Sequence, residues 1–316
     1  MKGINQARPW LAIAALAAAT VTGRAVEDAG TPASARDTSH TSPGFYHALT
    51  LAAAPSEATG GGGGQVKEGD DEGGLSEAAL AKIAQNPLAN LINVPFQNNF
   101  NFGVGPNEAT QWILNFQPVI PFSLSKDWNL ITRTIIPIID QPSPAPGIRS
   151  ASGLGDINPT FFFSPAKSDN FVWGIGPSLT FPTATDSLLG SGMYSAGPAA
   201  VVFLGLGQWK LGVIGNNQWS YAGWGPENVN QLTLQPIINY NFGGGWYLVT
   251  SPIMTANWKA SSSDRWTVPV GGGFGKLQKF GKLPVNINLQ AFYNVEKPEN
   301  GADWQLRFQV QFLFPK

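Results

Sequence analysis

The sequence has no cysteine and only two histidines among its 316 residues. Without cysteine, the chain can form neither a disulfide scaffold, nor a thiolate metal site, nor a cysteine nucleophile. The two histidines, His40 and His47, lie far from the region in which we expect strands. That region therefore lacks the histidine that a Ser–His catalytic pair or a His-based zinc site requires. We predict that the protein is not an enzyme, has no catalytic residues and binds neither a metal nor a cofactor.

Charge is scarce as well. Only 12% of the residues are charged and the formal net charge is −1. This is about half the usual share of charged residues in a soluble domain. A chain with so little positive charge is not expected to bind nucleic acid. Its polarity comes instead from Asn, Gln, Ser and Thr, as expected for the polar interior of a membrane β-barrel.

Long apolar runs are absent apart from residues 10–21, which follow the basic residues Lys2 and Arg8. A basic start, roughly a dozen apolar residues and nearby small residues are typical of a secretory signal peptide. We place this signal at residues 1–25. The run is too short to cross a bilayer comfortably as a helix, and the alternative is a buried or lipid-embedded N-terminal helix.

Residues 26–74 are rich in Ala, Gly, Ser, Thr and Pro. Such a segment cannot bury enough apolar surface to offset the entropy lost on ordering, so we predict a disordered, low-complexity tail. In residues 75–92, Ser76 is a suitable N-cap and Pro87 would end a helix. We therefore predict a short amphipathic helix there, followed by a β-domain at residues 93–316.

From residue 93 onward, apolar and polar residues alternate in runs that are separated by turn residues. The last run is the clearest, because every second residue from Trp304 to Phe314 is large and apolar, whereas Arg307 and three glutamines lie between them. Neighbouring residues of a strand point to opposite faces, so this strand has one apolar and one polar face. We predict twelve strands in all, at residues 94–103, 110–122, 128–139, 154–164, 170–181, 193–205, 208–220, 230–243, 246–257, 265–276, 284–294 and 303–314.

The connections between these runs alternate in length. Those at 125–127 and 205–208 are short, whereas those at 140–153 and 182–192 are long. The connection at 277–283 is an exception, because it is long where a short one is expected. Alternating loops, an even strand number and aromatic residues at both ends of the runs are typical of outer-membrane barrels. We therefore predict an all-β fold, a transmembrane antiparallel β-barrel of about 12 strands in the outer membrane of a Gram-negative bacterium, with membrane lipid and the barrel-assembly machinery as partners.

Proline occurs inside several of the runs, where it removes a hydrogen-bond donor from the sheet. We expect seven prolines to bend or interrupt their strands: Pro118, Pro159, Pro177, Pro198, Pro236, Pro252 and Pro269. They also favour an alternative fold, a secreted soluble β-sandwich that binds a ligand.

Few charged residues lie within the strands. The alternation of faces predicts seven lumen-facing candidates: Arg133, Lys210, Arg265, Arg307, Gln305, Gln309 and Asp156. Four basic residues on the polar face would make the interior of a barrel favour anions. The alternative is that the arginines pair with Asp156 or with acidic residues of the loops as a structural network.

Three segments resemble a known family. Residues 86–103 read NPLANLINVPFQNNFNFG, residues 153–160 read GLGDINPT and residues 176–183 read GPSLTFPT. Together they resemble the bacterial outer-membrane β-barrel family labelled MetA-pathway of phenol degradation, whose members are often named transporter or neuromedin U. The resemblance covers residues 86–316 and implies an outer-membrane location and uptake of small compounds, aromatic ones included. It identifies no catalytic or ligand-binding residue.

These observations predict an outer-membrane channel or transporter for passive uptake of small solutes, with aromatic or anionic compounds as the candidates. The sequence has no phosphate-binding loop followed by Lys and Ser or Thr that would couple transport to a nucleotide. Two alternatives stay open at this point. One is a surface or structural barrel that does not transport, and the other is the soluble β-sandwich.

Overall fold

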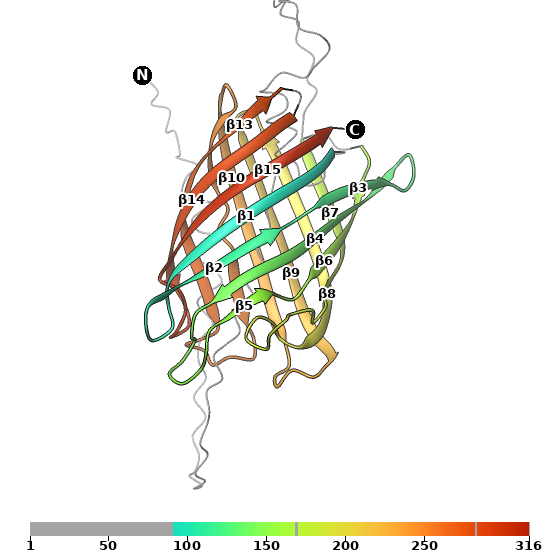
Figure 1. Ribbon diagram of the computed structural model, residues 1–316. Coiled ribbons are helices and arrows are strands. Elements are labelled where there is room, and N and C mark those ends of the chain that lie inside the picture. Colours follow the sequence, from blue (N-terminus) through green and yellow to red (C-terminus); the bar gives the residue numbers. More distant parts are fainter. Residues whose placement is uncertain (1–90, 168–169, 282, 316) are drawn as a thin grey trace, which may run out of the picture. The chain divides into compact units, whose positions relative to one another are not determined.

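The computed structural model describes residues 91–167, 170–281 and 283–315, and these form an all-β barrel (Figure 1). The strands are β1 (Leu91–Val104), β2 (Ala109–Phe116), β3 (Val119–Ser123), β4 (Trp128–Gln141), β5 (Ala151–Leu154), β6 (Asn158–Pro165), β7 (Phe171–Thr180), β8 (Met193–Leu206), β9 (Trp209–Gly223), β10 (Asn230–Gly243), β11 (Trp246–Thr250), β12 (Met254–Asn257), β13 (Trp266–Phe280), β14 (Leu283–Glu296) and β15 (Trp304–Pro315). The predicted signal peptide, tail and helix lie outside this part of the chain, except that residues 91 and 92 belong to β1. Within the described residues, no helix is long and apolar enough to cross a membrane.

The sheet closes on itself. Every neighbouring pair is antiparallel, β15 pairs with β1, and β9 pairs with β10 from Trp209↔Tyr240 to Trp219↔Asn230. Segments β2 and β3, β5 and β6, and β11 and β12 each form one interrupted strand, because both members of each couple pair with the same neighbouring strand. The fifteen segments therefore make a closed barrel of twelve strands, which confirms the predicted strand number and rules out a two-sheet sandwich.

The two ends of the barrel differ in their connections. β1 begins and β15 ends at the same end of the barrel, where Leu91 pairs with Pro315. Successive strands are joined by tight turns at this end. We call this the short-turn end. Gly207 and Gly244 lie in two of these turns with φ angles of +60° and +56°, which a side chain would make unfavourable. The expected exception at 277–283 disappears, because β13 continues to Phe280 and β14 begins at Leu283.

The opposite end carries the longer connections, and we call it the long-loop end (Figure 1). Its connections span residues 105–108, 142–150, 181–192, 224–229, 258–265 and 297–303. The loop at 181–192 lies between β7 and β8, and it is the longest of them. The alternation of short and long connections predicted from the sequence is thus present in the fold, except that the connection at 105–108 has only four residues.

The two faces of the sheet have opposite polarity. Large apolar side chains are exposed on the outer face, and aromatic rings lie near both ends: Trp128, Phe171, Trp209, Trp246 and Phe314 near the short turns, and Trp219, Trp258, Tyr293 and Trp304 near the long loops. The inner face carries buried Asn, Gln, Ser and Thr side chains together with Arg133, Lys210 and Arg307. This is the period-two pattern of a barrel that is apolar outside and polar inside.

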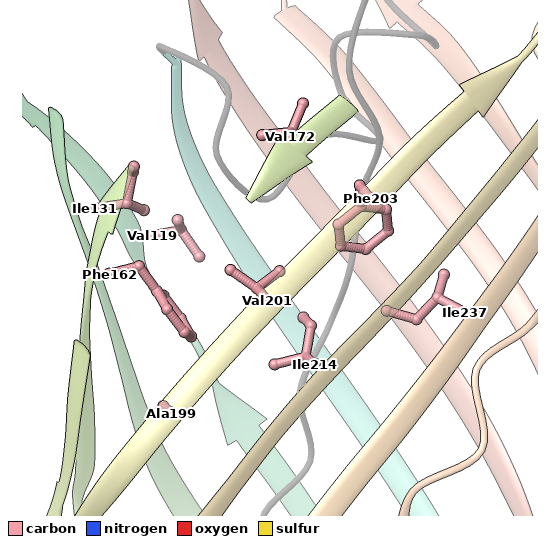
Figure 2. Close-up of a cluster of buried hydrophobic side chains, with 9 residues drawn as sticks. All are labelled: Val119, Ile131, Phe162, Val172, Ala199, Val201, Phe203, Ile214 and Ile237. Carbon is pink, nitrogen blue, oxygen red and sulfur yellow. The ribbon is translucent and has the colours of Figure 1, made fainter. Parts of the chain in front are cut away.

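One part of the inner wall is apolar. Figure 2 shows a buried cluster whose side chains come from seven consecutive positions around the barrel, β3, β4 and β6 to β10: Val119, Ile131, Phe162, Val172, Ala199, Val201, Phe203, Ile214 and Ile237. The ring of Phe203 lies over Gly212 of the adjacent strand, where an added Cβ would collide with it. The inner wall therefore has a polar and an apolar sector.

The three interruptions fall at residues 117–118, 155–157 and 251–253. Pro118 and Pro252 lie in two of them, as expected for a residue that cannot donate a hydrogen bond to the sheet. These prolines interrupt their strands as predicted.

The other prolines are accommodated without a break. Pro177 and Pro198 face one another across the β7–β8 ladder. Pro269 lies at a register shift between β13 and β14, and Pro236 continues the β9–β10 ladder opposite Val213. Pro118 and Pro252 thus interrupt their strands and Pro269 lies at an irregularity of the ladder, whereas Pro177, Pro198 and Pro236 stay in register with their neighbours.

Candidate functional site in the barrel interior

Arg307 is the centre of the polar sector. Its side chain is 1% exposed and lies on the inner face of β15. Nε donates to Oδ1 of Asn99 at 3.1 Å, Nη1 donates to the backbone oxygen and Oγ of Ser251 at 2.8 and 3.4 Å, and Nη2 donates to Oε1 of Gln305 at 2.9 Å. The guanidinium carbon lies 4.9 Å from the ring centroid of Phe292. All four acceptors are uncharged.

Ser251 reaches Arg307 because β11 is interrupted there. In the gap before Pro252, the Ser251 carbonyl accepts from Arg307 and from Nε2 of Gln235 at 3.1 Å. The backbone N–H and the Oγ of Ser251 both donate to Oε1 of Gln290, at 3.1 and 3.0 Å. Backbone groups that a continuous strand would use in the ladder are thus hydrogen-bonded to side chains of the inner wall.

A small polar cavity lies against this cluster. It has a volume of about 20 Å³, and its wall includes Gln97, Ser251, Gln290 and Gln309. This volume can hold one water molecule or an ion of similar size. Because Ser251 contacts both the cavity and Arg307, the guanidinium lies immediately behind the cavity wall.

The interruption at Pro118 has a similar arrangement. Arg133 of β4 is 2% exposed, and its Nη2 donates to Oε1 of Gln117 at 2.5 Å. Gln117 directly precedes Pro118, as Ser251 directly precedes Pro252. In both places a buried arginine donates to the residue that precedes the interrupting proline.

Asp156 lies in the interruption at residues 155–157 and holds the loop at 181–192. Its carboxylate accepts from the backbone N–H of Ala184 at 3.2 Å, and from the N–H and Oγ of Ser191 at 2.7 and 3.0 Å. Asp156 is 3% exposed, so these charge-assisted hydrogen bonds are shielded from water. Asp156 thus holds the loop to the barrel wall at two residues, Ala184 and Ser191, that are seven positions apart.

The same loop turns toward the inner wall. Leu189 is buried in a cluster with Ile113, Ile139 and Ala151, which come from the inner faces of β2, β4 and β5. The loop therefore lies over the inner face at the long-loop end and narrows that end of the barrel.

A salt bridge links this loop to its neighbour. Nη2 of Arg149, in the 142–150 loop, lies 2.5 Å from Oδ2 of Asp186. Hydrogen bonds from the backbone N–H of Leu188 and from Arg149 hold the pKa of Asp186 below its ordinary value. At the same end, hydrogen bonds from the backbone N–H of Glu299 and from two serine hydroxyls lower the pKa of Asp264.

The remaining predicted positions are distributed along the barrel. Gln309 is buried two residues from Arg307, and half-buried Gln305 also donates to Oδ1 of Asn101 at 2.6 Å. Lys210 of β9 is buried close to the short-turn end. Arg265 precedes β13 rather than lying in it, and it is half-buried at the long-loop end.

The structure also bears on the alternative that arginines form a salt-bridged network. In the described ranges, Arg307 donates its hydrogen bonds to neutral oxygens and forms no salt bridge, so that alternative is wrong for this residue. The described residues include no group of three His, Cys, Asp or Glu that could hold a metal ion. His40 and His47 lie outside the described part of the chain.

Several interior residues were not singled out from the sequence. These are the amides and the hydroxyl that surround Arg307: Gln97, Asn99, Asn101, Ser251 and Gln290. Asn and Gln at alternate positions of β1 and β14 are a signal that could have identified four of them. Ser251 carries no such signal, because its contacts depend on the interruption.

Comparisons with known proteins agree with the fold. No family model matches the sequence, and no curated protein matches it. Among solved structures, an outer membrane channel from Pseudomonas putida F1 is 16% identical with a TM-score of 0.54, over 71% of this chain and 94% of that chain. The NanC porin is 7% identical with a TM-score of 0.46, over 70% and 98% of the two chains. Outer membrane phospholipase A from Escherichia coli is 13% identical with a TM-score of 0.39, over 70% and 95%.

The similarity to the Pseudomonas putida channel shows a shared barrel fold, but at 16% identity it assigns no role to any residue of this chain. The other two have lower TM-scores and add no argument. The specific family that the sequence resembles stays a prediction.

Proposed function

We propose that the protein is an outer-membrane channel through which small solutes, including aromatic or anionic compounds, diffuse passively. One observation carries this proposal. The single closed sheet is apolar with two aromatic girdles on its outer face and largely polar on its inner face. A closed barrel leaves no unpaired strand edge in lipid, and a polar interior is what a hydrated solute requires.

The outer face supports the location in the membrane. Its exposed rings lie near both ends of the strands, and Trp and Tyr are favoured at the two membrane–water interfaces. In water, an exposed apolar surface that encircles a protein would instead lead to aggregation. The predicted signal peptide, membrane lipid and the barrel-assembly machinery belong to the same proposal.

The inner wall supports the choice of solutes. Its polar sector carries amides around Arg307, and its apolar sector is the cluster around Phe203 (Figure 2). A solute with an apolar body and a polar or anionic group would find a matching surface on each side. We propose passive diffusion, without enzymatic activity or a cofactor.

A second candidate is a surface barrel that does not transport. It is favoured by the burial of the inner side chains and by the 181–192 loop, which lies over the inner face. In this case the long loops would be the functional surface and the hydrogen-bonded interior would be a structural core.

Solute flux separates the two candidates. The full-length protein, purified in detergent and inserted into liposomes, should allow small sugars and organic acids to enter, which swelling assays and planar-bilayer conductance measure. Heat-modifiable gel mobility would establish that the barrel is folded. A folded barrel that gives neither swelling nor conductance would contradict the channel and support the surface barrel.

A further inference from the structure

We infer that Arg307 is an anion-binding residue of the barrel interior and that its charge gives the channel its preference for anions. This inference rests on the proposed function, and it assigns the ionic selectivity to one residue. Small monovalent inorganic anions, such as chloride, are the chemical class that the site would accept.

The charge of Arg307 has no acidic partner among its hydrogen-bond acceptors. Burial of a cation is unfavourable unless a charge or a complete set of hydrogen bonds compensates it. The salt bridges Arg149–Asp186 and Lys297–Asp303 join loop residues and do not involve Arg307. Arg307 is 1% exposed and donates only to uncharged oxygens. Its positive charge is therefore hydrogen-bonded but not neutralised by these contacts.

This charge lies close to a cavity of the barrel interior. The cavity lined by Gln97, Ser251, Gln290 and Gln309 lies beside Arg307, and Ser251 belongs to both. An anion in this cavity would be separated from the guanidinium by one side chain, in surroundings of low dielectric where attraction is stronger than in water. The cavity size matches a single small ion rather than a large solute.

Two of the side chains that accept hydrogen bonds from Arg307 also have other partners. The contact to Ser251 Oγ is long, at 3.4 Å, and the Oγ has a second partner in Gln290 at 3.0 Å. The half-buried Gln305 is held by Asn101 as well as by Arg307. The contact to Ser251 Oγ can be exchanged for an anion while the hydroxyl keeps its hydrogen bond to Gln290.

The test compares four variants in planar bilayers under a potassium chloride gradient. Wild type should show a chloride-to-potassium permeability ratio of about two to five, a difference of about 0.4–1 kcal/mol in favour of the anion. Arg307→Gln removes the charge, and Gln305→Glu neutralises it in place by putting a carboxylate against Nη2. Both should bring the ratio close to one. Arg307→Lys keeps the charge and should retain the preference.

Lys259→Gln is the matched control, because it removes an exposed cation from the 258–265 loop. Salt screens an exposed charge, so this variant should keep the wild-type ratio. If Arg307→Gln and Gln305→Glu both keep the wild-type ratio, the inference is overturned and Arg307 only braces the wall. Gln305→Glu leaves the arginine in place, so this arm does not depend on the folding of an Arg307 variant.

A binding measurement distinguishes failure of this inference from failure of the channel proposal. Thermal unfolding in detergent is recorded in potassium chloride and in potassium gluconate, whose anion is too large for the cavity. An anion that binds only the folded barrel raises the unfolding temperature, so chloride should stabilise wild type more than Arg307→Gln. A wild type without conductance would overturn the channel. Equal stabilisation of both proteins by chloride would overturn the anion site.

Discussion

Arg307 donates a hydrogen bond of 2.8 Å to the backbone oxygen of Ser251, the residue before the proline that interrupts its strand. The acceptors of Arg307 do not depend on it alone. The Ser251 oxygen also accepts from Gln235, and Oδ1 of Asn99 also accepts from Gln97 at 3.0 Å. Removal of the arginine therefore leaves few of its acceptors without a hydrogen bond, and it removes a charge from the buried interior.

We accordingly expect Arg307→Met to change the free energy of unfolding by less than about 1 kcal/mol, because replacement of a buried charge by an apolar chain of similar volume is often neutral or stabilising. Urea unfolding in lipid vesicles, followed by tryptophan fluorescence, measures this. Ser251→Ala is the comparison, and loss of its hydrogen bond to Gln290 should cost about 1 kcal/mol. A loss of about 3 kcal/mol or more in Arg307→Met would identify a structural brace instead.

Asp156 should control how firmly the 181–192 loop lies over the inner face. Asp156→Ala removes the acceptor of three hydrogen bonds from Ala184 and Ser191. Each bond to a charged group contributes about 1.5–3 kcal/mol, so the loop should open at least ten-fold more often. Limited proteolysis should then cut within 181–192 faster, and single-channel current should become larger or noisier. An unchanged cleavage rate would show that the loop is held by its other contacts, among them the packing of Leu189 and the salt bridge between Asp186 and Arg149.

Asp186 should make the contact between two long loops sensitive to acid. Its pKa is lowered by the Leu188 N–H and by Arg149, so the folded state binds the proton less readily than the unfolded state. The stabilising contribution is then complete above the ordinary pKa of aspartate and is lost as the pH falls through the lowered value. Proteolysis of the 142–150 loop should stay constant from neutral pH to about pH 4 and rise below it. Asp186→Asn should be cleaved at a rate that does not change with pH.

The number of strands, their faces and the alternating connections could be predicted because each depends on local pattern. A period of two assigns every residue of β15 to the correct face, and the twelve runs locate all twelve strands within a few residues. The inner position of Arg307 and Gln309 follows from the same alternation.

The interruptions could not be predicted in this way. Pro252 breaks its strand, whereas Pro236 stays in its ladder, and no local feature of the sequence separates the two. The role of Ser251 depends on partners 39 and 56 residues away, Gln290 and Arg307. The inward turn of the 181–192 loop depends likewise on the distant contacts of Asp156 and Leu189.

Gly275 should tolerate no side chain while Tyr247 is present. An added Cβ at this position would collide with the ring of Tyr247 on the neighbouring strand. Gly275→Ala should therefore destabilise the barrel by about 1–3 kcal/mol, the usual cost of overpacking. The change Tyr247→Ala should relieve the clash, so the double variant should be less destabilised than the sum of the two single changes. Strict additivity in urea unfolding would contradict this contact.

The seam between the first and last strands should owe part of its stability to one aromatic pair. Phe102 of β1 and Trp304 of β15 stack with their centroids 4.0 Å apart and an interplanar angle of 16°, and they are register partners at the long-loop end. Such pairs contribute about 0.5–1.5 kcal/mol beyond their buried area. A double-mutant cycle with Phe102→Ala and Trp304→Ala should give a coupling energy in this range.

Trp128 and Trp173 provide the matched pair for this cycle, because they meet edge to face with centroids 6.0 Å apart near the short-turn end. This pair joins two strands that are not at the seam. If the stacked pair guides closure, only its loss should also slow the appearance of the heat-resistant gel band during refolding into vesicles. Equal refolding rates for both alanine pairs would limit the role of Phe102 and Trp304 to equilibrium stability. A coupling energy near zero in the cycle would show that contacts with lipid replace the stacking.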